Sequence, residues 1–186
     1  RRSSDLFGGQ EGAILIAGTG SAGLIYRHGQ LHSCSGRGFP ISDLGSGAWL
    51  GLRAIQQSLL CHDGILPPSL LAVRLLDHFK RDQAEVVRWA ARAIPADYGR
   101  FAPWVFDAAS DGDELANQLL DETCAQLQTL LEGMGLLGAD RIALLGGVGM
   151  RLAPRLGHLN LVPPQADALE GAILFAQSEA YPCLHS

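Results

Sequence analysis

The stretch ILIAGTGSAGLI, residues 14–25, decides the fold of this protein. Its glycines Gly18, Gly20 and Gly23 have the spacing G-x-G-x-x-G, which dinucleotide-binding proteins use around a pyrophosphate. That role requires the glycines to open a helix, so that the pyrophosphate lies at the helix N-terminus. The sequence that follows, LIYRHGQLHSCSG (residues 24–36), instead has two short runs separated by a glycine-containing break. The stretch therefore predicts a β-hairpin and argues against a dinucleotide-binding unit.

The glycine-rich tip of this hairpin is a candidate phosphate site by another mechanism. Glycines let successive backbone N–H groups point inward as an anion-binding nest, and they admit a phosphate close to the backbone. The hydroxyl groups of Thr19 and Ser21 can add hydrogen-bond donors. A tight turn with nothing bound explains the same spacing equally well.

Composition limits the function classes. The chain has 186 residues, of which 47% are hydrophobic and 18% are charged, so it suits one domain, or one domain with a helical insertion. A net charge of -5 argues against nucleic acid, and no apolar run reaches the about 18–20 residues of a membrane span. The cysteines form no C-x-x-C pair, which predicts no metal site and reduced thiols in a cytoplasmic protein. They are Cys34, Cys61, Cys124 and Cys183.

Downstream of the hairpin, helical patterns dominate until a second strand. Ser46 is a plausible N-cap for a helix that Gly64 can end. We expect further helices from Pro67 through Lys80, over residues 83–94 and over residues 111–135. A buried strand with a glycine-rich end follows at residues 140–149, then a short strand at 158–164 and a closing helix at 166–180. This order predicts an α/β fold with a helical insertion.

Three glycine-rich segments are candidates for a common binding site. They are the hairpin tip, the segment GRGFPISDLGSGAW (residues 36–49) and the segment LLGGVGM (residues 144–150). Asp43 also suits a helix start through the helix dipole, and the last glycines also suit an ordinary strand-to-helix turn. Glycines at the carboxyl end of a strand leave room for a flat ring against the backbone. Taken together, the three segments predict a cleft for a nucleotide and a substrate.

Read in order, residues 14–25, GFPISDLGSGAWLGLRAI (residues 38–55) and IALLGGVG (residues 142–149) resemble the BadF/BadG/BcrA/BcrD-type ATPases. Within that group they look most like N-acetylglucosamine kinases of the sugar kinase/Hsp70/actin superfamily. The resemblance covers about residues 12–180. It implies an RNase H-like, actin-like ATPase domain of α/β class. Its strands are expected at about residues 12–36, a helical insertion at about 65–136, and a returning strand and helix at about 140–180.

The resemblance also implies roles for individual residues. The phosphates of ATP would be bound by Gly18, Thr19, Gly20 and Ser21, and adenosine by Gly146, Gly147 and Val148. The sugar would be contacted by Asp43, Thr19 and Ser46. ATP and Mg²⁺ are the implied cofactors. The chain departs from the family at Arg37, where an aromatic residue is usual, and at Leu44, where the family's GDEGS loop has an acid. The motifs therefore do not decide which sugar is the substrate.

The implied function is ATP-dependent phosphorylation of an amino sugar, N-acetylglucosamine in the first place, by a homodimer. The family's D-x-G-G-T loop and its general base belong to a first domain, and no D-x-G-G-T motif occurs in residues 1–186. We therefore expect these residues to be the C-terminal domain of a two-domain kinase, inactive without the N-terminal domain. Two alternatives are an ATPase activator with an iron–sulfur cluster, which the cysteine spacing disfavours, and a non-catalytic sugar- or nucleotide-binding module.

Overall fold

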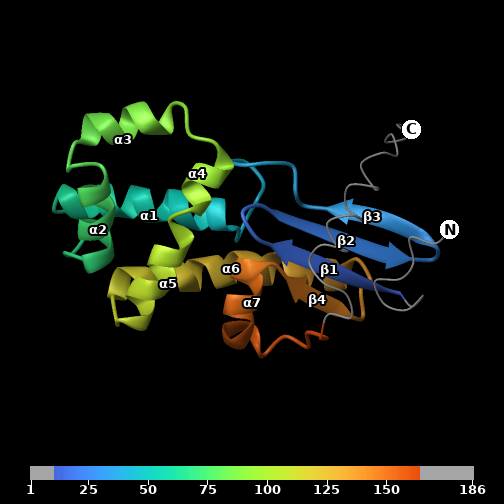
Figure 1. Cartoon of the computed structure of the whole chain (residues 1–186). Helices are drawn as coiled ribbons and strands as arrows, with labels where there is room; N and C mark the ends of the chain where they lie inside the picture. The colour runs from blue at the N-terminus through green and yellow to red at the C-terminus, as the bar shows by residue number, and fades with distance from the viewer. Residues whose placement is uncertain (1–10, 164–186) are drawn as a thin grey trace.

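A four-stranded mixed sheet forms one half of the computed structural model, which describes residues 11–163 (Figure 1). Its strands lie in the order β3-β2-β1-β4. β1 pairs antiparallel with β2, β2 pairs antiparallel with β3, and β4 runs parallel to β1. The bounds are β1 Gly12–Ala17, β2 Ser21–Arg27, β3 Gln30–Cys34 and β4 Ile142–Leu145. The predicted hairpin and α/β class are confirmed, and Gly23 lies within β2 rather than at a helix start.

β1 is a central strand with apolar side chains on both faces. Leu15 joins the larger core, which also includes residues of the helices, while Ile14 joins a smaller cluster on the other face with Leu24 and Leu145. A strand covered on both faces needs a near-continuous apolar run instead of an alternating one. This explains why residues 12–17 read as a buried strand in the sequence.

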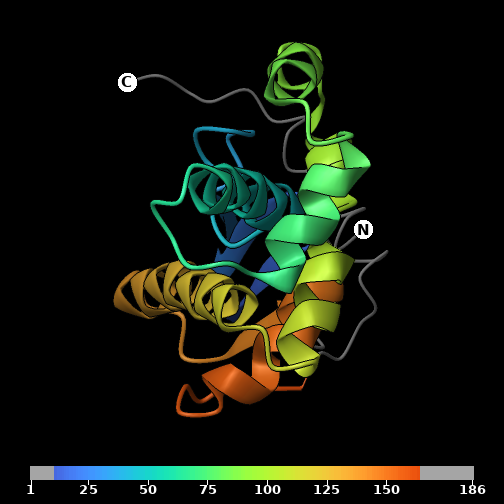
Figure 2. The same ribbon diagram turned by 90° about the vertical axis from the view of Figure 1, so that its left-hand side faces the viewer.

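The helices cover one face of the sheet and extend beyond it (Figures 1 and 2). α6 contacts β1, β2 and β4, and it also packs against α1. Away from the strands, α2, α4 and α5 pack on α1, and α5 also packs on α6, while α3 joins the core through Val86. The bounds are α1 Gly47–His62, α2 Leu70–His78, α3 Gln83–Ala90, α4 Pro95–Gly99, α5 Ala102–Ser110, α6 Glu114–Leu136 and α7 Gly147–Leu152. None of the helices in residues 11–163 combines the length and hydropathy that crossing a membrane requires.

Three helices differ from the predicted bounds. α6 begins at Glu114 and not at residue 111, because Asp113 caps its start. α2 begins at Leu70, not at Pro67, because the Ser69 side chain accepts a hydrogen bond from the N–H of Ala72 and caps the helix there. It ends at His78, since Lys80 has a φ of +54° that no right-handed helix accommodates. α3 ends at Ala90, four residues earlier than predicted.

The sequence patterns did not predict three short helices, α4, α5 and α7. Proline occupies one of the first two positions of α4 and of α5, where its fixed φ and missing N–H suit the start of a helix. The strand expected over residues 140–149 ends at Leu145, and α7 occupies its glycine-rich end. The strand expected over residues 158–164 is reduced to one parallel bridge between Ile142 and Leu161. The predicted closing helix at 166–180 lies outside the described residues.

Asp113 joins the beginnings of two helices. As the N-cap of α6 its carboxylate accepts a hydrogen bond from the N–H of Ala116 at 2.9 Å. The same carboxylate accepts from the N–H of Leu70 at 2.8 Å and from the hydroxyl of Ser69 at 2.9 Å, both at the start of α2. Burial raises the pKa of Asp113, but these hydrogen bonds outweigh it, so the pKa lies below its usual value.

Asp113→Ala is expected to lower the free energy of unfolding by about 2 kcal/mol at pH 7, since two helix caps of about 1 kcal/mol each are lost. Because the pKa of Asp113 is lower in the folded state, its ionised carboxylate stabilises the fold above the unfolded pKa of about 3.9. That stabilisation is lost as the pH falls through the lowered pKa. Urea denaturation at pH 7 and pH 3 should show a smaller difference at pH 3. Asp111→Ala is the control, and an equal loss there would contradict the capping role.

Candidate functional site

An open cleft with a volume of about 400 Å³ lies where four segments distant in the sequence meet. These segments are the β1–β2 hairpin tip, the start of α1, the α4–α5 region and α7. The cleft is lined by Gly18, Thr19, Gly47, Gly99, Ala102, Pro103, Phe106, Gly147, Val148 and Arg151. All three predicted glycine-rich segments therefore contribute to one cavity: the hairpin tip through Gly18 and Thr19, residues 36–49 through Gly47, and the end of β4 through Gly147 and Val148.

The hairpin tip is fixed by the start of α1. The N–H of Gly47 donates to the carbonyl of Gly18 at 2.7 Å, and the N–H of Ala48 donates to the carbonyl of Thr19 at 3.0 Å. Helix starts leave unpaired N–H groups, and the tip satisfies two of them. Within residues 11–163 the N–H groups of Thr19 and Gly20 have no hydrogen-bond partner. The tip therefore presents two backbone N–H groups that can donate hydrogen bonds to an anion.

α4 forms the wall opposite the tip. Its last residue, Gly99, packs so closely on Thr19 that a Cβ at Gly99 would lie 3.2 Å from the Thr19 Cγ2 atom. This approach depends on Gly51 in α1, where a Cβ would collide with the backbone carbonyl of Tyr98. A glycine in the middle of α1 thus lets α4 reach the hairpin tip.

The loop with Asp43 lies against the other side of the tip. A Cβ at Gly20 would lie 2.7 Å from the Asp43 Oδ2 atom, so the carboxylate sits directly over this glycine. The hydroxyl of Ser21 donates to the carbonyl of Leu44 at 2.7 Å and ties the loop to β2. Asp43 and Gly20 do not line the 400 Å³ cleft, but they adjoin Gly18 and Thr19 of the same tip, which do.

The two predicted serines are engaged inside the protein. Ser46 is fully buried, and its hydroxyl accepts from the N–H of Trp49 at 3.1 Å as the N-cap of α1. Ser21 is 3% exposed and bonded to Leu44. Their hydroxyl groups hold the tip and the Asp43 loop in place. Arg37 is exposed, and its N–H donates to the Ser42 hydroxyl at 3.0 Å.

The two glycines after β4 have different surroundings. Gly146 has a φ of +85°, and a Cβ there would collide with the carbonyl of Ala17 in β1. Gly147 has no atom within 4 Å of an added Cβ, and it lines the cleft together with Val148. Gly146 is therefore needed for the turn itself, whereas Gly147 leaves free space above the backbone for a ligand.

Sequence patterns alone missed one side of the cleft. The residues concerned are Gly99, Ala102, Pro103, Phe106 and Arg151. The only local signal was a glycine and a proline four residues apart, which marks a break and not a binding wall. The residues of α4 and α5 become part of a site only because these helices pack on α1, and Arg151 does so because α7 lies beside α5.

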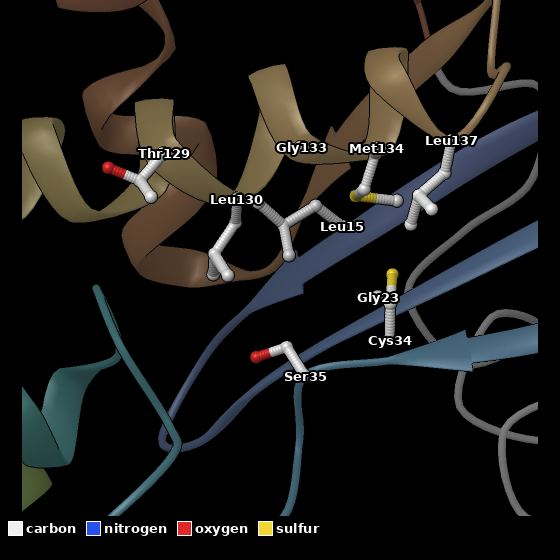
Figure 3. A pocket seen from close by; sticks show the side chains of 9 residues that line it. All are labelled: Leu15, Gly23, Cys34, Ser35, Thr129, Leu130, Gly133, Met134 and Leu137. Carbon is white, nitrogen blue, oxygen red and sulfur yellow. The ribbon is translucent and has the colours of Figure 1, made fainter.

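A second cavity, of about 150 Å³, lies between α6 and the strands (Figure 3). The sulfur atoms of Cys34 and Met134 point into it, beside Leu15 and Gly23. Burial raises the pKa of the Cys34 thiol, so the thiol stays protonated and weakly nucleophilic at neutral pH. We assign this cavity no part in the site.

The donor set for a metal ion is sparse. In the described range no three histidine, cysteine, aspartate or glutamate side chains gather closely enough to hold a metal. Mg²⁺ is commonly bound through one or two carboxylates together with the phosphate oxygens of a substrate. The carboxylate of Asp43 borders the hairpin tip, which is compatible with an ion that arrives on a nucleotide.

Sequence comparison relates the chain to curated proteins. It is 46% identical over 171 residues to the glucosamine kinase GspK of Vibrio cholerae, an alignment that covers 90% of this chain and 58% of that protein. It is 29% identical over 136 residues to an N-acetyl-D-glucosamine kinase of Dictyostelium discoideum, covering 70% of this chain and 43% of the relative. The chain thus spans about half the length of these curated relatives.

Structural comparison gives the same relationship. A solved structure of a proposed N-acetylglucosamine kinase from Chromobacterium violaceum matches with a TM-score of 0.78 and 36% identity, over 91% of this chain and 60% of that one. This match confirms the RNase H-like, actin-like ATPase fold implied by the sequence. The model of the BadF/BadG/BcrA/BcrD ATPase family matches residues 5–176. The chain belongs to the BadF/BadG/BcrA/BcrD ATPase family.

Proposed function

We propose that this chain provides the nucleotide-binding half of an ATP-dependent amino sugar kinase. The observation that carries this proposal is the shared cleft, in which the hairpin tip and the start of α7 face one cavity while Asp43 borders the tip. The free N–H groups of Thr19 and Gly20 suit phosphate oxygens, and the space above Gly147 suits the flat base of adenosine. The site thus has a phosphate end, a base end and an acidic neighbour.

Each predicted residue then has a role in the proposal. Gly18, Thr19 and Gly20 bind the β- and γ-phosphates, Gly147 and Val148 contact adenosine, and Asp43 accepts hydrogen bonds from sugar hydroxyls. Ser21, Ser46 and Gly146 hold these segments in position. Phosphoryl transfer depends mainly on placing the phosphate and the acceptor hydroxyl in line, with charge stabilised around them. Mg²⁺ bound to the nucleotide would neutralise phosphate charge.

The proposal includes a second domain and a second copy. The chain spans 58% of GspK and 60% of the Chromobacterium structure, which supports a two-domain kinase in which this chain is the second domain. The general base is not assigned to any residue described above. We propose that it comes from the first domain and that the whole protein is a homodimer.

The sugar is proposed to be glucosamine or N-acetylglucosamine. The relative with 46% identity is named a glucosamine kinase, whereas those with 36% and 29% identity are named as N-acetylglucosamine kinases. The higher identity places glucosamine first, ahead of the N-acetylglucosamine implied by the motifs alone. The Arg37 and Leu44 departures lie in the sugar-side loop and fit an altered sugar preference.

The test is ADP release by the full-length protein with Mg-ATP and glucosamine, N-acetylglucosamine, N-acetylmannosamine or glucose. We expect release that depends on an amino sugar. Asp43→Ala should lower kcat/KM for that sugar about 10- to 100-fold, because one or two hydrogen bonds to a charged group are lost. Asp63→Ala, an exposed aspartate at the other end of α1, is the matched control. ADP release that is equal with and without every sugar would contradict the kinase.

A further inference from the structure

Two side chains separate the 400 Å³ cleft from a neighbouring cavity of about 290 Å³. Phe106 of α5 and Arg151 of α7 line both spaces. The guanidinium carbon of Arg151 lies over the Phe106 ring, 4.0 Å from its centre, so the cation rests on the aromatic face. Phe106 is only 7% exposed, and the core therefore holds the ring in place. The two cavities are therefore separated by the Arg151 guanidinium and by the buried Phe106 ring on which it rests.

Arg151 has no counter-charge among the residues that the structure describes. In the range 11–163 no carboxylate lies within ion-pair distance of its guanidinium, and its side chain makes no hydrogen bond. Arg155, one turn further along the chain at the same cavity, donates to Asp121 at 2.6 Å and to Asn117 at 2.9 Å. The two arginines therefore differ in availability, and only Arg151 presents an unpaired guanidinium to the cleft.

Arg151 is also placed next to the free space above Gly147. The two residues are four apart in α7, and residues four apart lie on the same face of a helix. Gly147 has no atom within 4 Å of an added Cβ, so a flat group can rest on its backbone. Such a group would meet the exposed side of the guanidinium, whose opposite side is covered by Phe106.

We propose that Arg151, supported by the Phe106 ring, is the stacking platform for the nucleobase and that its guanidinium plane favours a purine. This inference rests on the proposed kinase function. An arginine plane is weakly hydrated and stacks on π-systems, and its attraction grows when the site excludes water. A purine has a larger π-surface than a pyrimidine, so the platform also contributes to the choice of nucleotide.

The test compares three variants of the full-length protein, Arg151→Met, Arg151→Lys and Arg155→Met. Calorimetry measures the Kd for ATP, CTP and inorganic tripolyphosphate, and thermal unfolding confirms that each variant folds. Methionine keeps apolar contact with the Phe106 ring, so Arg151→Met removes the planar cation without opening a gap. We expect Arg151→Met to weaken the binding of ATP about tenfold and the binding of CTP by less. The Kd for tripolyphosphate should stay unchanged.

The other variants separate stacking from simple charge attraction. Lysine keeps the charge but lacks the planar guanidinium, so Arg151→Lys should weaken ATP binding nearly as much as Arg151→Met. Arg155→Met should bind ATP like the wild type. Equal weakening of ATP and tripolyphosphate with rescue by lysine would mean that Arg151 contacts phosphate, and this would overturn the inference. Equal ATP binding by the wild type and Arg151→Met would also overturn it while leaving the kinase intact. No ATP binding by the wild type would overturn both.

Discussion

Gly51→Ala is expected to lower the free energy of unfolding by about 2–3 kcal/mol. The added Cβ would collide with the carbonyl of Tyr98, and its distance to the carbonyl carbon would be 2.7 Å. The Cβ position is fixed by the backbone of α1 and the carbonyl belongs to the backbone of α4, so no side-chain rotation can relieve the overlap, and α4 must move away from α1. The higher helix propensity of alanine would offset about 1 kcal/mol of a larger packing loss.

Equilibrium urea denaturation of the wild type and the variant measures this loss. Gly133→Ala is the matched control, because Gly133 also lies inside a helix but has no atom within 4 Å of an added Cβ. We expect this control to be as stable as the wild type or more stable by up to about 1 kcal/mol. If Gly51→Ala proved as stable as the control, α4 would not pack on α1 as closely as described.

Gly147→Val is expected to weaken ATP binding about 10- to 100-fold while leaving the free energy of unfolding within about 0.5 kcal/mol of the wild type. The valine side chain would enter the open space above residue 147, which we assign to the adenosine base. An added Cβ at residue 147 has no protein atom within 4 Å, so we expect the substitution to leave the packing of the folded protein unchanged. Loss of binding without loss of stability would mark Gly147 as a ligand-contacting residue.

Calorimetry with ATP and urea denaturation are run on the same preparations. Gly157→Val is the control, since Gly157 has right-handed helical backbone angles, lies outside the cleft and makes only an ordinary contact with Pro154 at an added Cβ. Its ATP affinity should equal that of the wild type. An unchanged Kd of Gly147→Val for ATP would contradict the assignment of adenosine to this part of the cleft.

The neighbouring glycine illustrates why the two roles had to be separated by the structure. Gly146 and Gly147 are indistinguishable in the sequence, and the family resemblance implies one adenosine-binding role for both. In the fold, only Gly146 lies against β1, where the carbonyl of Ala17 leaves no room for a Cβ. A stability loss is therefore expected at residue 146 and a binding loss at residue 147.

Local patterns predicted most of the elements that form the site. The break at residues 28–30 placed a β-hairpin where the glycine spacing alone indicated a dinucleotide loop, and Ser46 was correctly identified as the N-cap of α1. The α/β class and the family also followed from the residues. The short helices α4, α5 and α7 did not, because their proline and glycine residues are typical of breaks and turns as well as of helix starts.

The sequence by itself determined the hairpin, the capped helix, the buried strands and the family, because turn chemistry, capping and hydrophobic runs act between near neighbours. Only the tertiary structure decided which residues share the cleft. Gly51 meets Tyr98, Arg151 meets Phe106, and Asp43 meets Gly20 across separations of 47, 45 and 23 residues. Such contacts depend on how whole helices pack, and that packing leaves no local trace in the amino-acid pattern.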